Sequence, residues 1–344
     1  MTRHLLALLL STAAHAQSPD IRFGTPTPPA KQPNSIRLAT YNVENLFDAV
    51  DDPALSGQNE DKDALKPDKA CRAAAETIRL LDADILALEE IESEAALRWF
   101  RDTYLTNLGY DHLASLDAGD ERGIEQSVLS RFPIKSTKNF PRQALEGVHP
   151  AKAPDAPEGS PLTFHRSPLF VEVEVPPARG ANDKPYTLTL VVIHMKSGAR
   201  SAYWREAEAK GALSLIDRFQ KENPAVNIAV LGDFNSQPAD ASYKSFIASG
   251  LTDTLSNRDG TPKFITHESG RTIDYLLVNS NLAPEIIPGS AFVFGRPARP
   301  AGVDWRTYPA PDGYASDHYP VSIDITPVDA PASPGSTQVN PVSQ

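Results

Sequence analysis

The sequence lacks the features that would tie this protein to a disulfide framework, a membrane or a partner attracted by positive charge. Its 344 residues include one cysteine, Cys71, so no disulfide can form within the chain and stability must come from a packed core. No apolar run reaches the ~20 residues that a membrane-spanning helix needs. Positive charge is in the minority, with 33 Lys and Arg against 44 Asp and Glu and a formal net charge of -11. No global field therefore attracts nucleic acid, and an anionic substrate has to be held by local groups or by cations.

Length and composition are typical of one large globular domain, and the two ends of the sequence differ from it in composition. A charged residue, Arg3, precedes a short apolar segment over residues 5–10 and the small-residue site Ala14-His15-Ala16, which is the pattern of an export signal. The last residues are rich in Pro, Ser and Gln. We therefore predict a signal peptide at 1–16, a Pro-rich flexible lead-in at 17–34, one domain at 35–327 and a disordered tail at 328–344. The expected location is the periplasm or the external medium.

One stretch joins a buried strand to two polar side chains that face the same way. The apolar run over residues 228–231 stops at Gly232, and Asp233 and Asn235 follow. Residues i and i+2 of an extended chain point in one direction, so the carboxylate and the amide converge. The acid can align or deprotonate a water while the amide donates to a phosphate oxygen. Gly-Asp-x-Asn is also common as an ordinary turn, so the pair is a candidate site.

Two further predicted strands run into polar groups. Residues 36–41 alternate in polarity and end at Asn42, which is either a turn former or an amide that orients a ligand. Residues 85–88 run directly into three acids, Glu89, Glu90 and Glu92. Burying acids is costly unless a cation or solvent receives them. Strand alternation places Glu90 and Glu92 on one face, so Glu90 is our candidate for the first metal carboxylate and Glu92 the next.

Other candidates stand at the ends of later strands. His194 follows a β-prone run over residues 186–193, Asp274 lies inside an apolar run over 273–278, and Asp317 and His318 precede the last strand. Helical periodicity predicts helices at 70–81, 95–108 and 201–219, between the strands.

Two more candidates lie around a long segment without clear periodicity, residues 135–160, which we expect to be a loop that touches substrate. Glu125 opens the preceding strand, where it is either a solvated strand-end acid or a group that orients a histidine. Arg166 stands before a strand, beside a Pro, and could clamp a phosphate with two parallel hydrogen bonds.

The ordered set of motifs resembles the endonuclease/exonuclease/phosphatase superfamily over residues 36–326. That superfamily contains deoxyribonuclease I, exonuclease III-type repair nucleases, neutral sphingomyelinases and inositol polyphosphate phosphatases. The resemblance implies an α/β fold, a four-layered α/β-sandwich of two packed, mostly antiparallel sheets flanked by helices, with the site at one end. The motifs are Asn42, Glu90 within Leu-x-Glu-Ile-Glu, His194-Met195-Lys196-Ser197, Gly232-Asp233-Phe234-Asn235, Ile273-Asp274-Tyr275 and Ser316-Asp317-His318-Tyr319-Pro320.

The resemblance also implies roles for single residues. Glu90 is similar to the principal Mg²⁺ ligand, with Asn42 and Asp317 nearby, and Asn42 is also placed to contact phosphate. His318 resembles the histidine that faces the scissile phosphate, oriented by Asp274.

The remaining roles belong to the second half of the site. His194 resembles the second histidine, with Glu125 as its best partner. Asp233 and Asn235 are similar to the pair that positions water and phosphate, and Arg166 falls where deoxyribonuclease-like members place a phosphate-contacting Arg. Whether Asp233 or His318 takes the proton of the water stays open.

The predicted protein is an exported, Mg²⁺-dependent phosphodiesterase, with Mn²⁺ or Ca²⁺ as alternative cations, that acts as a monomer. Its expected substrate is nucleic acid, DNA or RNA, cleaved without sequence preference because contacts to the backbone carry little sequence information. Two alternatives remain: an enzyme acting on phospholipid or inositol-phosphate head groups, and a non-catalytic relative that only binds partners. The cations expected to hold the nucleic acid are Lys135, Lys138, Arg142, Arg166 and Lys196.

Overall fold

The computed structural model describes residues 21–50, 65–153, 156–177, 184–255, 264–304 and 307–329. The predicted signal peptide, and all but the first two residues of the predicted tail, lie outside these ranges. Among the described residues, no helix combines the length and the apolar character needed to cross a bilayer.

The first sheet has six strands and contains the first predicted strand at its centre. β1 pairs in parallel with β2, whereas all the other pairs in this sheet are antiparallel. The strand order is β13 (Phe292–Val293), β14 (Val321–Ile325), β1 (Ile36–Leu46), β2 (Ile85–Ile91), β4 (Glu125–Ser130) and β3 (His112–Ser115).

The second sheet repeats this plan. β10 pairs in parallel with β9, and the other pairs are antiparallel. The strand order is β11 (Thr252–Asp253), β12 (Asp274–Val278), β10 (Asn227–Asp233), β9 (Tyr186–His194), β8 (Leu169–Val175) and β5 (Ile134–Lys138). Each sheet therefore has one parallel pair at its centre, so the carboxyl ends of β1, β2, β9 and β10 can carry neighbouring side chains.

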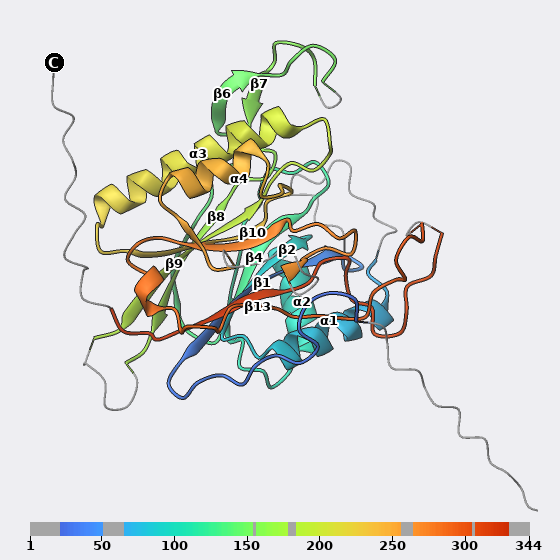
Figure 1. Cartoon of the computed structure of the whole chain (residues 1–344), viewed down its shortest axis with the longest axis vertical. Coiled ribbons are helices and arrows are strands. Elements are labelled where there is room, and N and C mark those ends of the chain that lie inside the picture. The colour runs from blue at the N-terminus through green and yellow to red at the C-terminus, as the bar shows by residue number, and fades with distance from the viewer. Residues whose placement is uncertain are drawn as a thin grey trace, which may run out of the picture.

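The two sheets pack face to face, and the alternation of side chains along each strand supplies both faces. In β1, Leu38 joins the core between the sheets, whereas Ala39 packs against the outer helices. Helices α1 (Asp68–Leu81) and α2 (Glu94–Tyr104) cover the first sheet, and α3 (Ala202–Glu222) and α4 (Ala241–Ala248) cover the second (Figure 1). The four-layered α/β-sandwich is confirmed.

The segment expected to be a long loop is more ordered than its sequence indicates. Residues 135–160 contain part of β5 and all of β6 (Ala144–Val148), which pairs with β7 (Pro161–Thr163) just beyond them to form a hairpin arm at the top of Figure 1. The arm is anchored because Leu162 packs against Trp204 of α3. Short strands of this kind have too few residues for a period to be visible in the sequence. One 3₁₀ turn, η2 (Ala283–Glu285), precedes β13.

The predicted flexible lead-in is the other difference. Within its described part, residues 21–34, the Thr25 N–H donates to the Val293 carbonyl at 2.7 Å and the Gly295 N–H donates to the Thr25 carbonyl at 2.9 Å. Lys31 forms a salt bridge to Asp84 at 3.0 Å. Composition did not indicate these contacts. A Pro-rich chain is extended in advance and loses little further entropy when an edge strand holds it.

Candidate active site

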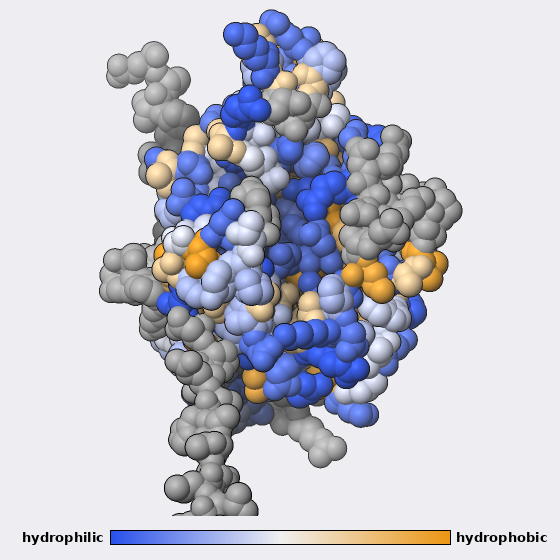
Figure 2. All heavy atoms as spheres, turned by 90° about the vertical axis from the view of Figure 1, so that its right-hand side faces the viewer, coloured by the Kyte–Doolittle hydropathy of each residue, from blue (hydrophilic) through white to orange (hydrophobic). Residues whose placement is uncertain are grey.

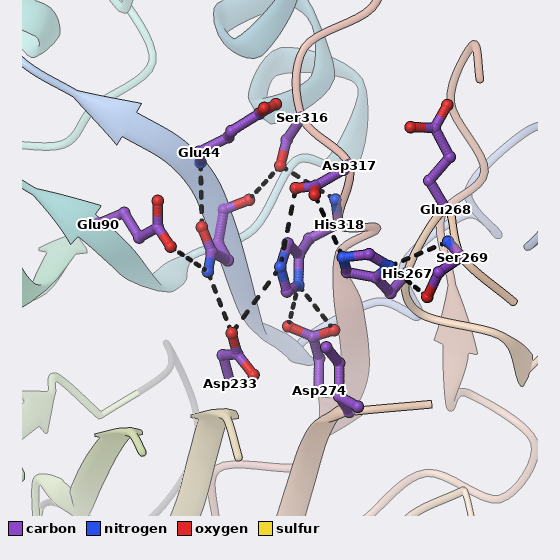
Figure 3. A network of polar contacts seen from close by, with 12 residues as sticks. Glu44, Glu90, Asp233, His267, Glu268, Ser269, Asp274, Ser316, Asp317 and His318 are labelled. Carbon is purple, nitrogen blue, oxygen red and sulfur yellow. Dashed lines mark hydrogen bonds and ion pairs between the residues drawn. The ribbon is translucent and has the colours of Figure 1, made fainter. Parts of the chain in front are cut away.

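The carboxyl end of β1 delivers an amide to the centre of the site. Asn42 is fully buried, and its Oδ1 accepts the Glu44 N–H at 3.0 Å. Its Nδ2 donates to Glu90 Oε1 and to Asp233 Oδ2, both at 3.3 Å. Glu44 and Asn45 take left-handed φ values of 56° and 55°, and the sharp turn brings the Asn45 N–H to Glu90 Oε2 at 2.9 Å. Asn42 therefore links the two sheets at this end of the sandwich through Glu90 and Asp233, which are labelled in Figure 3.

The carboxyl end of β2 turns one acid toward Asn42 and buries another. The register of β2 against β4 shifts between Glu89 and Ile91, and Glu90 has a φ of 66°, so Glu90 is a bulge residue. Glu89 lies between the sheets, where its Oε1 accepts from Thr40 Oγ1 at 2.7 Å and burial raises its pKa well above the usual value. Glu92 instead accepts the Asp48 N–H at 2.8 Å. Simple alternation, which puts Glu90 and Glu92 on one face, does not hold here because the bulge interrupts it.

Three strands of the second sheet bring their polar residues into one row. The register pairs Asp233 of β10 with His194 of β9 and, on the other side, with Asp274 of β12. Gly232 is required just before this row, because a Cβ there would lie 2.0 Å from the Ile193 carbonyl oxygen. Asn235, with a φ of 47°, donates its backbone N–H to Asp233 Oδ1 at 2.7 Å.

His318 faces the row from the loop before β14. Its Nδ1 lies 2.9 and 3.0 Å from the two oxygens of Asp274, and its Nε2 lies 3.8 Å from both Asp233 Oδ2 and Asp317 Oδ1. Ser316 fixes this loop, because its Oγ donates to the Asn42 carbonyl at 2.8 Å and accepts the His318 N–H at 3.0 Å. Burial opposes protonation of His318, but Asp274 and Asp233 raise its pKa well above the usual value.

His194 is the opposite case. Its Nε2 lies 3.6 Å from Asp233 Oδ2 and 3.9 Å from Glu90 Oε1, and its Nδ1 has no hydrogen-bond partner among the described residues. Burial, together with the charge of Arg166, lowers its pKa well below the usual value. His194 is therefore a neutral imidazole within the same cluster that contains a charged one.

Two predicted residues make contacts that the sequence did not indicate. The Glu125 carboxylate accepts from Ser115 Oγ at 2.6 Å, and its role as the partner of His194 stays a prediction. Arg166 is 2% exposed and donates to the carbonyls of His194 and Met195 at 3.1 and 2.8 Å. Arg166 positions the end of β9 from inside the protein, and its direct contact with phosphate stays a prediction.

His267 belongs to the site although no sequence motif pointed to it. Its Nε2 lies 3.2 Å from Asp317 Oδ2, its Nδ1 accepts the Ser269 N–H at 3.0 Å, and its ring stands edge-on to His318 with centroids 4.6 Å apart. Burial would raise the pKa of Asp317, but the hydrogen bond from His267 and the charge of His318 hold it below the usual value.

The oxygen-rich side of the cluster fits a divalent cation. Glu90 and Asp317 offer carboxylate oxygens, the ligands that hard cations prefer, and Asn42 lies beside Glu90 with its Nδ2 toward that carboxylate and its Oδ1 on the Glu44 N–H. Two further groups of close ligand atoms occur in the described chain: His267, Asp317 and His318, and Asp233, Asp274 and His318. A bound divalent cation polarises phosphoryl oxygens and lowers the pKa of water. Protonated His318 can donate to a phosphate or leaving oxygen, and Asp233, whose pKa burial raises, is suited to accept a proton near neutral pH.

This combination defines a class of protein. A four-layered sandwich with an amide, acids and two histidines at one end is built to hydrolyse phosphoric esters with a divalent metal. The chain belongs to the Endonuclease/Exonuclease/phosphatase family, whose model matches residues 39–318. It is accordingly a metal-dependent phosphoric ester hydrolase, and the predictions of family, fold and enzyme class are confirmed. A comparison with curated proteins returned no match for this chain.

Solved structures share the fold across most of the chain. The human Nocturnin catalytic domain with bound sulfate has a TM-score of 0.52 at 17% identity, covering 86% of this chain and 95% of that one. TDP2 from D. rerio, complexed with single strand DNA product, has a TM-score of 0.54 at 13% identity, covering 84% and 98%. A family member from Bacteroides thetaiotaomicron has a TM-score of 0.51 at 18% identity, covering 86% and 98%. At these identities the likeness establishes the fold, and substrate has to be argued from the site.

Proposed function

We propose that this protein is an exported, Mg²⁺-dependent phosphodiesterase that cleaves nucleic acid strands without sequence preference, with DNA as its main substrate. The observation that carries the proposal is the placement of cations on both sides of an acidic centre. The exposed Arg122 donates to Asn45 Oδ1 at 2.6 Å, on the side where Asn45 holds Glu90. Arg271 donates to Ser269 Oγ at 2.7 Å, on the side of His267. Figure 3 places Glu90 and Ser269 on opposite sides of His318.

A strand that carries negative charge along its length suits this arrangement. His318 can bind the scissile phosphate at the centre, beside the residues that would hold the metal, and cations beyond it on each side can bind the neighbouring phosphates. Figure 2 shows that the face on the right of Figure 1 is hollowed and strongly hydrophilic in its middle. A polar hollow favours a polyanion over the acyl chains of a lipid.

Not every cation predicted to hold the nucleic acid is free to do so. Lys135 lies 3.4 Å from Glu174, in a salt bridge on the second sheet.

The chemistry proposed is direct attack by water on the phosphodiester. The site has to neutralise the anionic oxygens and hold the water in line with the leaving group. Glu90, Asn42 and Asp317 would hold the metal, which would supply the first function when bound. Asp233 and Asn235 align the water, and His318, charged through Asp274, stabilises the phosphate or the leaving oxygen.

The deciding assay offers the purified protein several substrates at millimolar Mg²⁺: plasmid DNA, RNA, sphingomyelin and inositol polyphosphates. We expect nicking and degradation of the plasmid, no activity after chelation, recovery when Mg²⁺ is restored, and no activity in His318→Ala. Comparing Mg²⁺ with Mn²⁺ and Ca²⁺ identifies the preferred cation. Release of phosphocholine or inorganic phosphate with the plasmid left intact would show that the substrate is a head group.

Export is part of the same proposal and rests on the apolar segment and the Ala14-His15-Ala16 site near the start of the sequence. The mature protein is then expected to begin at Gln17. Mass spectrometry of protein isolated from the producing cell would test this, and an intact segment from Met1 to Gln17 in that material would rule out cleavage.

A further inference from the structure

A cavity of about 430 Å³ opens beside the catalytic centre. Asp317 and His267 line one wall, and Asp317 Oδ1 lies 3.8 Å from Nε2 of His318. The remaining wall includes Arg22, Arg271, Arg299 and Glu268. A group bound in the cavity would thus be a direct neighbour of the phosphate that faces His318. The volume lies in the range of small-ligand sites and exceeds what a single phosphate needs.

The charges of this cavity favour an anion. Arg299 is neutralised locally, because its Nη1 lies 2.8 Å from Glu268 Oε2. Arg22 donates to the Arg299 carbonyl at 2.7 Å and Arg271 donates to Ser269 Oγ at 2.7 Å. Within the described residues, no carboxylate forms an ion pair with either Arg22 or Arg271. Two guanidinium groups without a counter-charge therefore remain on the cavity wall, and guanidinium groups bind phosphate through paired hydrogen bonds.

The cavity is built by backbone contacts and does not depend on exposed side chains alone. Gly24 approaches β13 so closely that a Cβ there would lie 2.6 Å from the Gly295 nitrogen, and this contact fixes the segment that carries Arg22. The His267 and Thr266 N–H groups donate to the Arg271 carbonyl at 3.1 Å, which holds Arg271 beside the turn. Glu268 points away from the catalytic centre in Figure 3. Its Oε2 accepts from Arg299 Nη1 at 2.8 Å.

We propose that this cavity is a subsite for the nucleotide next to the scissile phosphodiester, with Arg271 and Arg22 binding its phosphate. The inference rests on the proposed function, because it assumes that the scissile group is a phosphodiester of a nucleic acid. It adds that efficient cleavage requires a second phosphate on one defined side. A choline head group would be disfavoured there, because its positive charge would face two arginines.

The test compares small substrates that differ by one phosphate. Dithymidine monophosphate has a scissile diester and no flanking phosphate, and its 5′-phosphorylated and 3′-phosphorylated forms each add one. We expect kcat/KM to rise at least tenfold for one of the two phosphorylated forms, mainly through a lower KM. Arg271→Ala and Arg22→Ala should each remove most of this gain, while Arg271→Lys should keep a substantial part of it.

Arg98→Ala is the matched control, because Arg98 lies on the surface of α2 and pairs only locally with Glu94 at 2.7 Å. It should retain the full gain. The subsite is refuted if the wild type cleaves all three compounds equally, or if the gain survives intact in Arg271→Ala and Arg22→Ala. Absence of cleavage of these compounds and of plasmid DNA would instead refute the proposed function. Turnover of inositol polyphosphates in its place would reject the nucleotide assignment.

Discussion

At the scale of residues, two histidines of one cluster are held in opposite protonation states by their partners. His318 faces Asp274 and Asp233, which raise its pKa well above the usual value. Burial, together with the charge of the nearby Arg166, lowers the pKa of His194. The result is one group that donates a proton or a charged hydrogen bond and one that stays neutral. Such a division suits a reaction in which negative charge develops on one oxygen while a water is positioned by another group.

The first prediction concerns Asp274→Asn. Losing the carboxylate at 2.9 Å from Nδ1 removes the main reason for the raised pKa of His318. We expect kcat/KM at neutral pH to fall by about 10² or more, the usual value of a positioned acid or base. The alkaline limb of the pH profile should also move to lower pH, because the neutral imidazole then forms at lower pH. A pH profile that keeps the wild-type shape would exclude this role.

The second prediction concerns the metal. Glu90→Gln should abolish turnover while the fold persists, since removing one charge from an acidic cluster relieves repulsion. Isothermal titration with Mg²⁺ should show at least a tenfold loss of affinity. Glu89→Gln is the control, because Glu89 lies buried between the sheets, where its pKa is raised by burial and its carboxylate faces Thr40, and it should bind Mg²⁺ as the wild type does. Near-normal activity of Glu90→Gln at saturating Mg²⁺ would contradict the assignment.

Single residues were predictable where they stand at the end of a long strand. The sequence places Asn42, Asp233 and His318 at such ends, and the structure brings them together. The contacts of Arg166 and Glu125 were harder to predict. Residue type and a position beside a strand do not determine whether a side chain faces solvent or the protein's own backbone. His267 could not be found, since only the pairing of its turn with the loop of His318 brings it to the site.

At the scale of elements, strand ends determine the site more than strand interiors do. The parallel pairs β1 with β2 and β9 with β10 put four carboxyl ends at one edge of the sandwich. Periodicity could predict these strands because each is long and buried. It could not predict the bulge at Glu90, which reverses the face of the following Ile91. Nor could it predict β11 and β13, of two residues each, which form only because a neighbouring strand already exists.

The third prediction belongs to α3, which carries the buried Glu208. Its carboxylate accepts the N–H groups of His165 and Lys196 at 2.9 and 2.8 Å, and burial raises its pKa from 4.5 to about 7. Because the folded protein then binds this proton more tightly than the unfolded chain, stability falls as pH rises from 4.5 through about 7. The difference between these two pKa values corresponds to about 3 kcal/mol of unfolding free energy.

Glu208→Gln should remove this dependence. Chemical denaturation at several pH values is the measurement, and the difference in unfolding free energy between variant and wild type should shift in favour of the variant by up to about 3 kcal/mol from pH 4.5 to 8. The absolute stability of the variant is a poor guide, because Gln offers one carbonyl oxygen to two N–H groups. A difference that stays constant over this pH range would show that Glu208 titrates normally.

At the scale of the whole molecule, a net charge of -11 coexists with a few cations around the site. The order of the motifs along the chain was enough to predict the family and the layers, because that order reflects which strands meet at one edge. The charge distribution over the surface could not be derived in the same way. Of the cations expected from the sequence, Lys135 pairs with Glu174 and Arg166 is buried, whereas Arg122 and Arg271 flank the centre.

The last prediction follows from this distribution. Few phosphate contacts mean little counterion release, so cleavage of an unstructured oligonucleotide should depend on salt only moderately. Two phosphate contacts, one through Arg122 and one shared by Arg22 and Arg271, at about 0.7 ions each on a single strand, give a slope near -1.4 for log(kcat/KM) against log(salt) below saturation. Steady-state rates between 50 and 200 mM salt measure it. Arg122→Ala should make the slope shallower by about 0.7, and Arg98→Ala should leave it unchanged. A slope far steeper than about -1.4 would mean that a larger basic surface, outside these three arginines, holds the strand.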